Sequence, residues 1–460
     1  MNQRRGRCTR DYFTLSASVE GEFFGHGWTR MNTVRKILVW IVFVPLCCGQ
    51  TWIDDYLREA GAMNKVCGAK EWVGCRDHLL RLKELLDGRV DIVYRLAKAE
   101  AMLGDKDAAL RGLMLYSKSG LTFADPGAAP EFSSLKNSPE FEMVLDRVKA
   151  ARAPRSASKP FRTLPEADLI AEDIAYDPRG DKFYISSVRH SKILAVDRKG
   201  ASAEFARGVW PILALGVDSK RRILWASTAA LPEGIGYRKE DEGRSALLKY
   251  SLDSGALSKS YDLKNDAKHS LGDMTVSAAG DVYVSDGEGA VYWVDHAKDT
   301  LDVLVPKGVF HSPQTPALSA GGRRLLVPDY SRGIGIVDLA SRQVKLLEHP
   351  KELPLDGIDG MYLSGRTLIA IQNGTAPERL IRMTLDAALT RVLEWETIEA
   401  NWTGLGDPTH GVVVRDQFYF IANSGWDRMA DDGSLKPGAT FEPATIRQMR
   451  LDAKPTSPQK

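Results

Sequence analysis

The sequence predicts a mainly β protein, a six-bladed β-propeller preceded by a small all-α helical domain. Three observations lead to this fold class. Residues 52–153 carry helical periodicity and almost no strand signal. From Pro160 onward the chain consists of short runs rich in Val, Ile and aromatic residues, separated by Gly, Asp, Asn and Pro turns. These runs repeat six times at intervals of about 40–60 residues, a period typical of propeller blades.

Residues 1–50 are expected to be a leader with a secretory signal. Val34–Gln50 reads VRKILVWIVFVPLCCGQ, in which two basic residues precede the apolar core Ile37–Leu46. That core is too short to span a bilayer comfortably. Met31 stands at the usual distance before the signal and is the expected true start. A membrane anchor and lipidation at Cys47 or Cys48 are the alternatives. We therefore expect a secreted or periplasmic protein.

The charge distribution argues against one class of partner. The 460-residue chain has a net charge of +2. Residues 1–50 contain seven basic and three acidic side chains, so they contribute +4 and the remainder carries −2. The remainder thus has no basic excess with which to bind a phosphate backbone, and nucleic acid is not expected as a partner.

Two of the five cysteines, Cys67 and Cys75, lie beyond the predicted signal. Their separation of eight residues in an exported protein favours one disulfide, and two free thiols on a helical segment are the alternative. Two cysteines alone are poor evidence for a zinc site.

Residues 51–153 are expected to form the helical domain. Helical patterns run over Asp77–Asp87, Val90–Leu103 and Lys106–Ser117, with a Gly-Asp turn between the last two. The pattern resembles a tetratricopeptide repeat, and Glu131–Val148 resembles the sequence that often closes such arrays. A generic helical hairpin packed on the neighbouring domain is the alternative. The segment carries no titratable cluster, so its expected task is docking a protein partner.

The remaining boundaries follow from composition. Residues 154–163 are expected to be a linker, 164–453 the propeller and 454–460 a tail. A strand near Phe161–Leu164 is expected to pair with the last blade, which ends in Ile446–Leu451, and so close the ring. Closure removes the free strand edges that such a chain would otherwise expose.

The repeats place six equivalent points at the entries of the innermost strands, where they face one another across the central channel. They are Glu172, Leu215, Asp273, Thr315, Asp359 and His410. Several carboxylates at one channel mouth repel each other unless some protonate or a cation binds among them. Carboxylate and amide oxygens suit calcium, magnesium or manganese. A neighbouring carboxylate or imidazole would then serve as general base.

Four phrases are distinctive: they begin at Glu172 (EDIAYDP), Asp273 (DMTV), Asp359 (DGMY) and Ile421 (IANSGW). They resemble the SMP-30/gluconolactonase/paraoxonase superfamily, and more closely its bacterial exported members with a helical N-terminal domain. The likeness covers about Leu164–Leu451. The resemblance implies a lactonase or esterase with a calcium or similar divalent ion at the channel. It also implies that the ion is held by a first-blade Glu, third- and fourth-blade Asn residues and a fifth-blade Asp.

Carried over position by position, the resemblance places Glu172 and Asp359 as ion ligands. The third-blade Asn is replaced by Gly272, so Asp273 beside it is the expected substitute. The fourth-blade Asn is replaced by Gln314, whose side chain is one methylene longer. The predicted metal ligands are Glu172, Asp273, Gln314 and Asp359, and the predicted catalytic residues are His410 and Asp273.

Other polar residues are expected to be structural. Asp356 and Gly357 are interpreted as turn formers. His410 is a base, a ligand or a hydrogen-bonded channel residue, and His269 is a weaker candidate for the same roles. Asn423 is expected to satisfy backbone groups at a turn. Blade-turn aspartates and tryptophans of the inter-blade core complete this set: Asp197, Asp218, Asp295, Asp338, Trp225, Trp293 and Trp426. Asn373-Gly-Thr is a glycosylation sequon, meaningful only in a eukaryotic secretory route.

Two functions compete on this evidence. The first is a hydrolase of lactones or small esters that depends on a divalent metal. The second is a non-catalytic propeller that holds a small-molecule ligand in its channel and docks a protein through its helical domain. The altered third- and fourth-blade positions favour the second hypothesis, and the convergent carboxylates favour the first.

Overall fold

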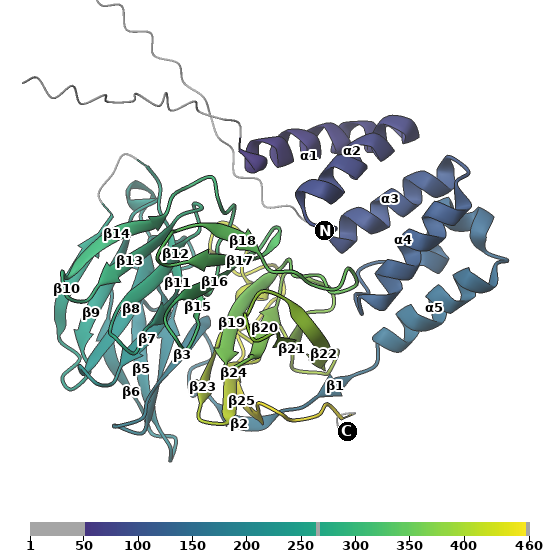
Figure 1. Cartoon of the computed structure of the whole chain (residues 1–460). Helices are drawn as coiled ribbons and strands as arrows, with labels where there is room; N and C mark the ends of the chain where they lie inside the picture. The colour runs from purple at the N-terminus through teal and green to yellow at the C-terminus, as the bar shows by residue number, and fades with distance from the viewer. Residues whose placement is uncertain (1–50, 264–266, 457–460) are drawn as a thin grey trace, which may run out of the picture. The chain divides into compact units, whose positions relative to one another are not determined.

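The structure is a computed structural model that describes residues 51–263 and 267–456. Its strands form six sheets arranged as the blades of a propeller, which confirms the predicted fold class (Figure 1). The expected leader and signal, residues 1–50, lie outside the described residues, as does most of the expected tail. Within the described part of the chain, no helix combines the length and apolar character needed to cross a bilayer.

Each blade is an antiparallel sheet whose strands follow one another in sequence from the channel outward. Blade one comprises β3 (Ala171–Asp177), β4 (Lys182–Ser187), β5 (Lys192–Asp197) and β6 (Ser202–Arg207), and blade two comprises β7 (Ile212–Asp218), β8 (Ile223–Ala229), β9 (Ser245–Ser251) and β10 (Leu257–Asp262). Blade three comprises β11 (Leu271–Val276), β12 (Val282–Asp286), β13 (Val291–Asp295) and β14 (Thr300–Val305), and blade four comprises β15 (Ala317–Leu318), β16 (Arg324–Asp329), β17 (Gly333–Asp338) and β18 (Val344–Leu346). Blade five comprises β19 (Ile358–Ser364), β20 (Thr367–Gln372), β21 (Arg379–Leu385) and β22 (Val392–Ala400), and blade six comprises β23 (Gly411–Val414), β24 (Gln417–Ile421) and β25 (Thr445–Arg450).

The ring is closed by a strand from the other end of the propeller sequence. Strand β2 (Lys159–Thr163) pairs antiparallel with β25, with Arg162 opposite Ile446, and becomes the outermost strand of blade six. The pairing predicted for a strand near Phe161–Leu164 is thus confirmed. Because the first and last strands share one sheet, the ring cannot open without breaking this ladder.

The segment 154–163 differs from the linker expected there. Besides β2 it contains β1 (Arg155–Ser156), which pairs with β22 as a fifth strand of blade five. Between the two strands, the backbone N–H groups of Ala157 and Ser158 each donate to Glu399 Oε1 at 2.7 Å. Composition indicated a linker because Pro, Ser and charge are also tolerated on edge strands, where fewer backbone groups need partners.

Within the described residues, five α-helices precede the propeller, which agrees with the helical character predicted for this segment. They are α1 (Trp52–Gly68), α2 (Trp72–Leu85), α3 (Val90–Met102), α4 (Lys106–Lys118) and α5 (Pro139–Ala151), with 3₁₀ turns η1 (Pro126–Ala128) and η2 (Pro130–Leu135) before α5. Thr51 caps α1 in a capping box with Asp54, and Ser138 caps α5 with Pro at its first position. A disulfide joins Cys67 to Cys75, which confirms the favoured pairing.

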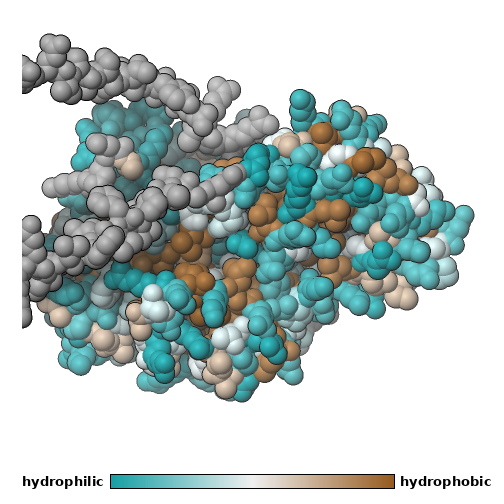
Figure 2. Space-filling model, turned by 45° about the horizontal axis from the view of Figure 1, so that its top comes forward, coloured by the Kyte–Doolittle hydropathy of each residue, from teal (hydrophilic) through white to brown (hydrophobic). Residues whose placement is uncertain are grey.

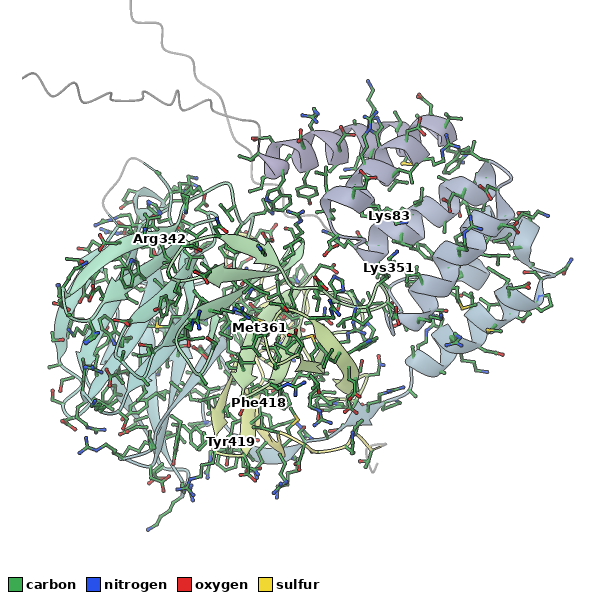
Figure 3. All side chains as sticks on the ribbon, viewed as in Figure 1. Lys83, Arg342, Lys351, Met361, Phe418 and Tyr419 are labelled. Carbon is green, nitrogen blue, oxygen red and sulfur yellow. A yellow bond between two sulfur atoms is a disulfide. The ribbon has the colours of Figure 1, made fainter. Side chains whose placement is uncertain are left out.

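The helical segment contacts the propeller mainly along blades four and five. Arg379, at the start of β21, is fully buried and donates through Nη1 to the carbonyl of Ser119 at 2.7 Å. The N–H of Thr122 donates to the carbonyl of Ala376 at 2.7 Å. Two cavities border this junction, one of about 600 Å³ and one of about 730 Å³. Lys83 and Lys351, both labelled in Figure 3, line the larger one from its two sides.

Apolar side chains fill the spaces between neighbouring blades. Trp225, 2% exposed, packs between blades two and three with Leu271 and Val282, as expected for an inter-blade core residue. Trp293 packs in the same way between blades three and four. The face shown in Figure 2 is mostly hydrophilic, with hydrophobic side chains gathered in small areas.

Candidate metal and active site

A bulge at the entry of the inner strands positions the candidate site. In β3, β7, β11 and β19 the pairing register shifts just after the first residue, so two residues at each strand entry lack a ladder partner. These are the positions of Glu172-Asp173, Gly272-Asp273 and Asp359-Gly360 in three of the blades. A bulge re-aims the side chains that it carries. The recurring bulge therefore explains why acidic side chains from separate blades meet in the channel.

Three buried side chains form the centre of the site. Asp273 of β11, Asp359 of β19 and His410, just before β23, each offer a ligand atom, and these atoms all lie within 4.8 Å of one another. Their exposed fractions are 6%, 9% and 1%. Two carboxylates and an imidazole from blades three, five and six are thus brought together, although 137 residues (410 − 273) separate the first from the last. We name Asp273, Asp359 and His410 the channel cluster.

The hydrogen bonds of His410 define the state of its ring. Nδ1 lies 2.9 Å from the backbone carbonyl oxygen of Glu172, which can only accept, so Nδ1 carries a hydrogen. Nε2 lies 2.9 Å from Asp273 Oδ1. A hydrogen on Nε2 would not point at this oxygen. Nε2 therefore has no well-aligned hydrogen-bond partner among the described residues. Nε2 is therefore a buried polar atom held beside a carboxylate without a proper hydrogen bond.

Gln314, which precedes β15, completes the cluster. The terminal amide atom that faces the cluster lies 3.3 Å from Asp273 Oδ2 and 3.2 Å from Asp359 Oδ1. With nitrogen at this position, the amide donates to both carboxylates and its oxygen accepts from Ser312 Oγ at 3.0 Å. With oxygen there, three oxygens converge and the nitrogen donates to Ser312 Oγ instead. The second arrangement is stable only when a cation lies between the oxygens.

Burial and mutual repulsion disturb the ionisation of the cluster. Burial raises the pKa of Asp359 to about 7; His410 opposes this rise and Asp273 adds to it. Burial would by itself lower the pKa of His410, but the carboxylates of Asp273 and Asp359 hold it well above the ordinary value. The site thus favours a positive charge close to Asp273 and Asp359, supplied either by the imidazolium or by a metal ion.

Glu172 does not join the channel cluster. Its side chain is half-buried, and its carboxylate accepts a short hydrogen bond from the indole N–H of Trp426. Its backbone carbonyl accepts from Thr409 Oγ1 at 2.8 Å as well as from His410. Burial raises the pKa of the Glu172 carboxyl well above its usual range, with Asp359 and Asp273 adding to the rise. Of the four predicted ligands, the structure therefore groups Asp273, Asp359 and Gln314 and holds Glu172 beside them.

Three residues at the site were not predicted to act there. Asn373 donates through Nδ2 to Asp359 Oδ2 at 2.6 Å, and the hydroxyl of Tyr330 donates to Asn373 Oδ1 at 3.0 Å. Trp426 packs against the buried cluster of Ile170, Val188 and Leu213, as expected for an inter-blade core residue, and its indole N–H also donates to Glu172. Because these residues lie at the ends of loops, they belong to no periodic pattern in the sequence, and Asn373 was noted only as part of a glycosylation sequon. Together with Gln314 and Glu172, these half-buried side chains form a polar rim around the cluster.

Asp173, next to Glu172, has a structural role. Its Oδ1 accepts from the N–H of Ile174 and its Oδ2 from the N–H of Leu215, each at 2.7 Å. The carboxylate therefore joins the inner strands of blades one and two. A cavity of about 200 Å³ lies further along the inner strands, lined by Tyr176, Val217, Met274 and neighbours that include Asp173, Thr315, Tyr362 and His410. His410 thus borders this cavity, whereas Asp273 and Asp359 are not in its walls.

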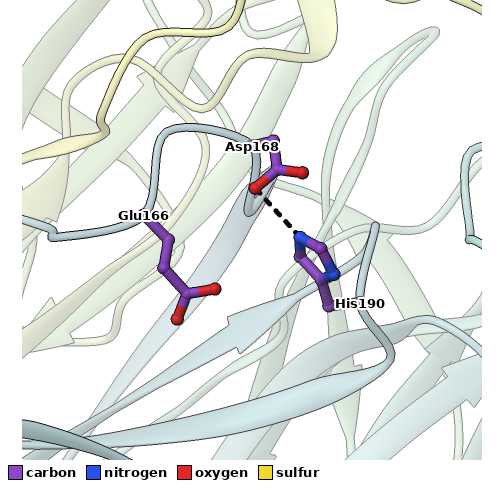
Figure 4. A group of neighbouring side chains, drawn as sticks. All are labelled: Glu166, Asp168 and His190. Atoms are coloured by element: carbon purple, nitrogen blue, oxygen red, sulfur yellow. Dashed lines mark ion pairs between the residues drawn. The ribbon is translucent and has the colours of Figure 1, made fainter.

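A second group, Glu166, Asp168 and His190, also brings ligand atoms within 4.8 Å (Figure 4). His190 Nε2 lies 3.0 Å from Asp168 Oδ1. Lys192 Nζ, however, lies 2.6 Å from Glu166 Oε2, and Arg189 lies 3.5 Å from Asp168. Because cationic side chains already balance both carboxylates, this group needs no metal ion. A third group, Asp281, Asp295 and His296, lies at surface turns, where Asp295 accepts backbone N–H groups.

The remaining candidates are structural, as expected. Asp197, Asp218 and Asp338 each accept backbone N–H groups of their own turns. Asn423 accepts from the N–H of Thr445 at 2.8 Å. His269 pairs with Asp286 at 2.7 Å outside the channel cluster. Asp356 shapes its turn next to Gly357, whose φ is 66°, and also lies 3.5 Å from Arg89 of the helical segment.

Comparisons with known proteins concern the fold alone. No family model and no curated protein matches the chain. A gluconolactonase from Xanthomonas campestris has 13% identity, with 61% of this chain and 86% of that chain covered and a TM-score of 0.43. A luciferin-regenerating enzyme has 12% identity, coverage of 64% and 97%, and a TM-score of 0.45. Virginiamycin B lyase from Staphylococcus aureus has 13% identity, coverage of 63% and 97%, and a TM-score of 0.41.

The channel cluster passes a physical test for a divalent cation. Together with the Gln314 amide, the cluster offers two carboxylates and an imidazole, all of which are common metal ligands. If the Gln314 amide is turned so that its oxygen takes the position 3.2–3.3 Å from the two carboxylates, the three oxygens can share one ion at bonds of about 2.3–2.6 Å. The poorly aligned Nε2 of His410 is the kind of buried polar atom that a metal ion satisfies. The residues present therefore fit the group that the sequence predicts.

Proposed function

We propose that this protein is an exported hydrolase of lactones or small esters that depends on a divalent metal and acts at the channel cluster. The observation that carries the proposal is the convergence of Asp273, Asp359, Gln314 and His410 in one buried group. These four residues would hold the ion. A bound divalent ion polarises a carbonyl oxygen and lowers the pKa of a water molecule.

The residues of this chain divide the remaining work. Asn373 and Tyr330 form the polar part of the rim, where they orient the carbonyl group of a substrate. Asn373 positions Asp359 through its 2.6 Å hydrogen bond. Glu172 is half-buried next to the cluster, and burial raises its pKa, so its ionised carboxylate is a stronger base than an ordinary one and would take a proton from water and return it to the leaving alcohol. Trp426 fixes the carboxylate of Glu172 for that role.

One specific observation supports a second candidate function. If the Gln314 amide donates to both carboxylates and His410 is an imidazolium, the cluster is balanced without any metal ion. The propeller would then be a non-catalytic module with a small-molecule ligand at its channel. In either case we propose that the helical segment docks a protein partner.

The deciding experiment combines metal analysis, thermal unfolding and hydrolysis. The full chain is freed of metal with a chelator, then titrated with divalent ions and tested on a panel of lactones and aryl esters. We expect a rise in Tm with the ion and hydrolysis that requires it. Asp359→Asn should lose both responses, whereas Asp338→Asn, a turn residue of blade four, should keep both.

Two results separate the candidates. Failure of every divalent ion to bind the wild-type chain would overturn the proposed hydrolase and favour the non-catalytic module. Equal ion-dependent activity in Asp359→Asn and Asp338→Asn would also contradict it, because the ion would then act elsewhere.

A further inference from the structure

We propose that His410 binds the ion directly through Nε2, that Glu172 does not bind it, and that the site therefore prefers a metal such as Zn²⁺ to Ca²⁺. This inference rests on the proposed metal-dependent function and deepens it. It concerns which residues of this chain form the ligand set and which class of ion they select.

The first step is the orientation of the imidazole. The hydrogen bond from Nδ1 to the Glu172 carbonyl fixes the hydrogen on Nδ1 and turns Nε2 towards Asp273. Metal-binding histidines characteristically donate their other ring N–H to a carbonyl or carboxylate, which fixes the ring in this way. His410 is therefore held as a ligand is held, on the channel side of blade six.

The second step is the position of Nε2 relative to the carboxylates. Its 2.9 Å separation from Asp273 Oδ1 is close, yet the ring N–H does not point at this oxygen. Two ligand atoms 2.9 Å apart subtend an angle of about 90° at an ion bound at ~2.1 Å, an ordinary bond length to zinc. A shared metal ion explains both the short separation and the poor alignment.

The third step removes Glu172 from the ligand set. Its carboxylate is engaged by the indole N–H of Trp426, 254 residues away in sequence (426 − 172), and it is absent from the group of mutually close ligand atoms. The backbone of Glu172 serves the site instead, because its carbonyl orients His410. Blade one thus contributes a hydrogen-bond acceptor where a carboxylate ligand was expected.

The fourth step is the choice of ion. The resulting set contains one nitrogen and three oxygens, from His410, Asp273, Asp359 and Gln314. Calcium prefers six to eight oxygens, a number that this set cannot supply without several waters. Imidazole nitrogen suits zinc and neighbouring transition metals. Four protein ligands leave room for a water molecule or a substrate carbonyl on an ion that expands beyond four-coordination.

The test measures ion binding rather than activity. Metal-free full chain is titrated with Zn²⁺, Mn²⁺, Ca²⁺ and Mg²⁺ by calorimetry, and the Mn²⁺-loaded protein is examined by pulsed electron paramagnetic resonance for coupling to ¹⁴N. We expect affinity for Zn²⁺ at least tenfold above that for Ca²⁺, together with the ¹⁴N coupling of a bound imidazole in the Mn²⁺-loaded protein. The spectroscopic result needs no variant, so it stands even if a variant does not fold.

Variants assign the ligands. His410→Gln places an amide oxygen near the position of Nε2, so ¹⁴N coupling should disappear and Zn²⁺ affinity should fall by 10–100-fold while Ca²⁺ affinity falls less. Glu172→Gln should change affinity by less than about threefold, and Asp338→Asn is the matched control. Three results would overturn this inference while leaving a metal-dependent hydrolase standing. They are a preference for Ca²⁺, the absence of ¹⁴N coupling, or a loss of Zn²⁺ affinity in Glu172→Gln equal to that in His410→Gln. Failure to bind any divalent ion would overturn both.

Discussion

His410 Nε2 lies 2.9 Å from Asp273 Oδ1, so the entry of blade six contacts the entry of blade three across the channel. The side chains are 1% and 7% exposed, and solvent therefore screens this pair weakly. In the metal-free protein the contact links opposite sides of the ring, so its removal should lower the free energy of unfolding of the whole propeller.

The first prediction concerns that link. In the presence of a chelator, His410→Ala should lower the free energy of unfolding by about 3–5 kcal/mol, because it leaves two buried carboxylates without a positive neighbour. Adding Asp273→Asn should recover part of the loss. Urea unfolding measures both values. The exposed pair Arg391–Glu348 is the control, and its disruption should cost below about 1 kcal/mol. Additive effects of the two channel substitutions would contradict the coupling.

The second prediction concerns the junction of helices and propeller. Arg379 donates to Ser119 at 2.7 Å and to Gln372 at 2.8 Å, and burial lowers its pKa to about 10. Arg379→Met should cost about 2–4 kcal/mol, because buried acceptors lose charged donors. It should also speed cleavage near Gly120 in limited proteolysis. The exposed Arg391→Ala is the matched control. An unchanged cleavage pattern would show that the helices are held by other contacts.

The third prediction is a pH dependence of stability outside the channel cluster. Burial, with the charge of Asp407 adding to it, raises the pKa of Glu378 from 4.5 to about 7. A carboxyl with a higher pKa in the folded state binds its proton more tightly there. The stabilisation of the folded state by this tighter proton binding is therefore complete below pH 4.5 and is lost as the pH rises to about 7.

Glu378→Gln should thus raise the free energy of unfolding at pH 8 relative to wild type and change it little at pH 4. The difference in the free energy of unfolding should be below about 3 kcal/mol, because partial exposure of the side chain weakens the effect of burial. Chemical unfolding at several pH values measures it, with the exposed Glu394→Gln as a control for removing one carboxylate elsewhere. A wild-type advantage at pH 8 would contradict the sign.

The fourth prediction concerns the disulfide between α1 and α2. Cys67–Cys75 closes a short loop, so replacing both cysteines by serine should cost about 2–3 kcal/mol through the entropy of the unfolded chain. Thermal unfolding with and without reductant measures the effect. The reductant should lower the Tm of the wild type and leave the double variant unchanged. Equal responses of the two proteins would show that the bridge contributes nothing.

Much of the architecture was predictable because the local periodicity of the sequence indicates where the strands and helices lie. Six copies of a strand-turn-strand phrase, spaced about 40–60 residues apart, predict six blades, and the strand near Phe161 predicts the closing pair. The helices of residues 52–151 follow from apolar spacing, although α2 begins at Trp72 rather than Asp77. The segment at Arg155 was read as a linker because two-residue edge strands leave no periodic signal.

The site was only partly predictable for the same reason. Asp273, Asp359, Gln314 and His410 lie at repeat-equivalent or neighbouring positions, so their convergence follows from the fold. The direction of Glu172 does not, since it depends on Trp426, which reaches it from a loop after β24. Asn373 and Tyr330 likewise come from blade ends that periodicity leaves unspecified.

The sequence by itself determined the number of blades, the helical segment before them and the acidic residues at the channel entry. Tertiary structure alone decided which atoms meet there, because ring closure brings residues from blades three, four, five and six within a few ångströms. Tertiary packing places Asp359 of blade five beside Asp273 and His410 in the channel, and it places the neighbouring Asp356 beside Arg89 of the helical segment. Local pattern assigns a residue to a strand entry, whereas its partners depend on how the whole ring packs.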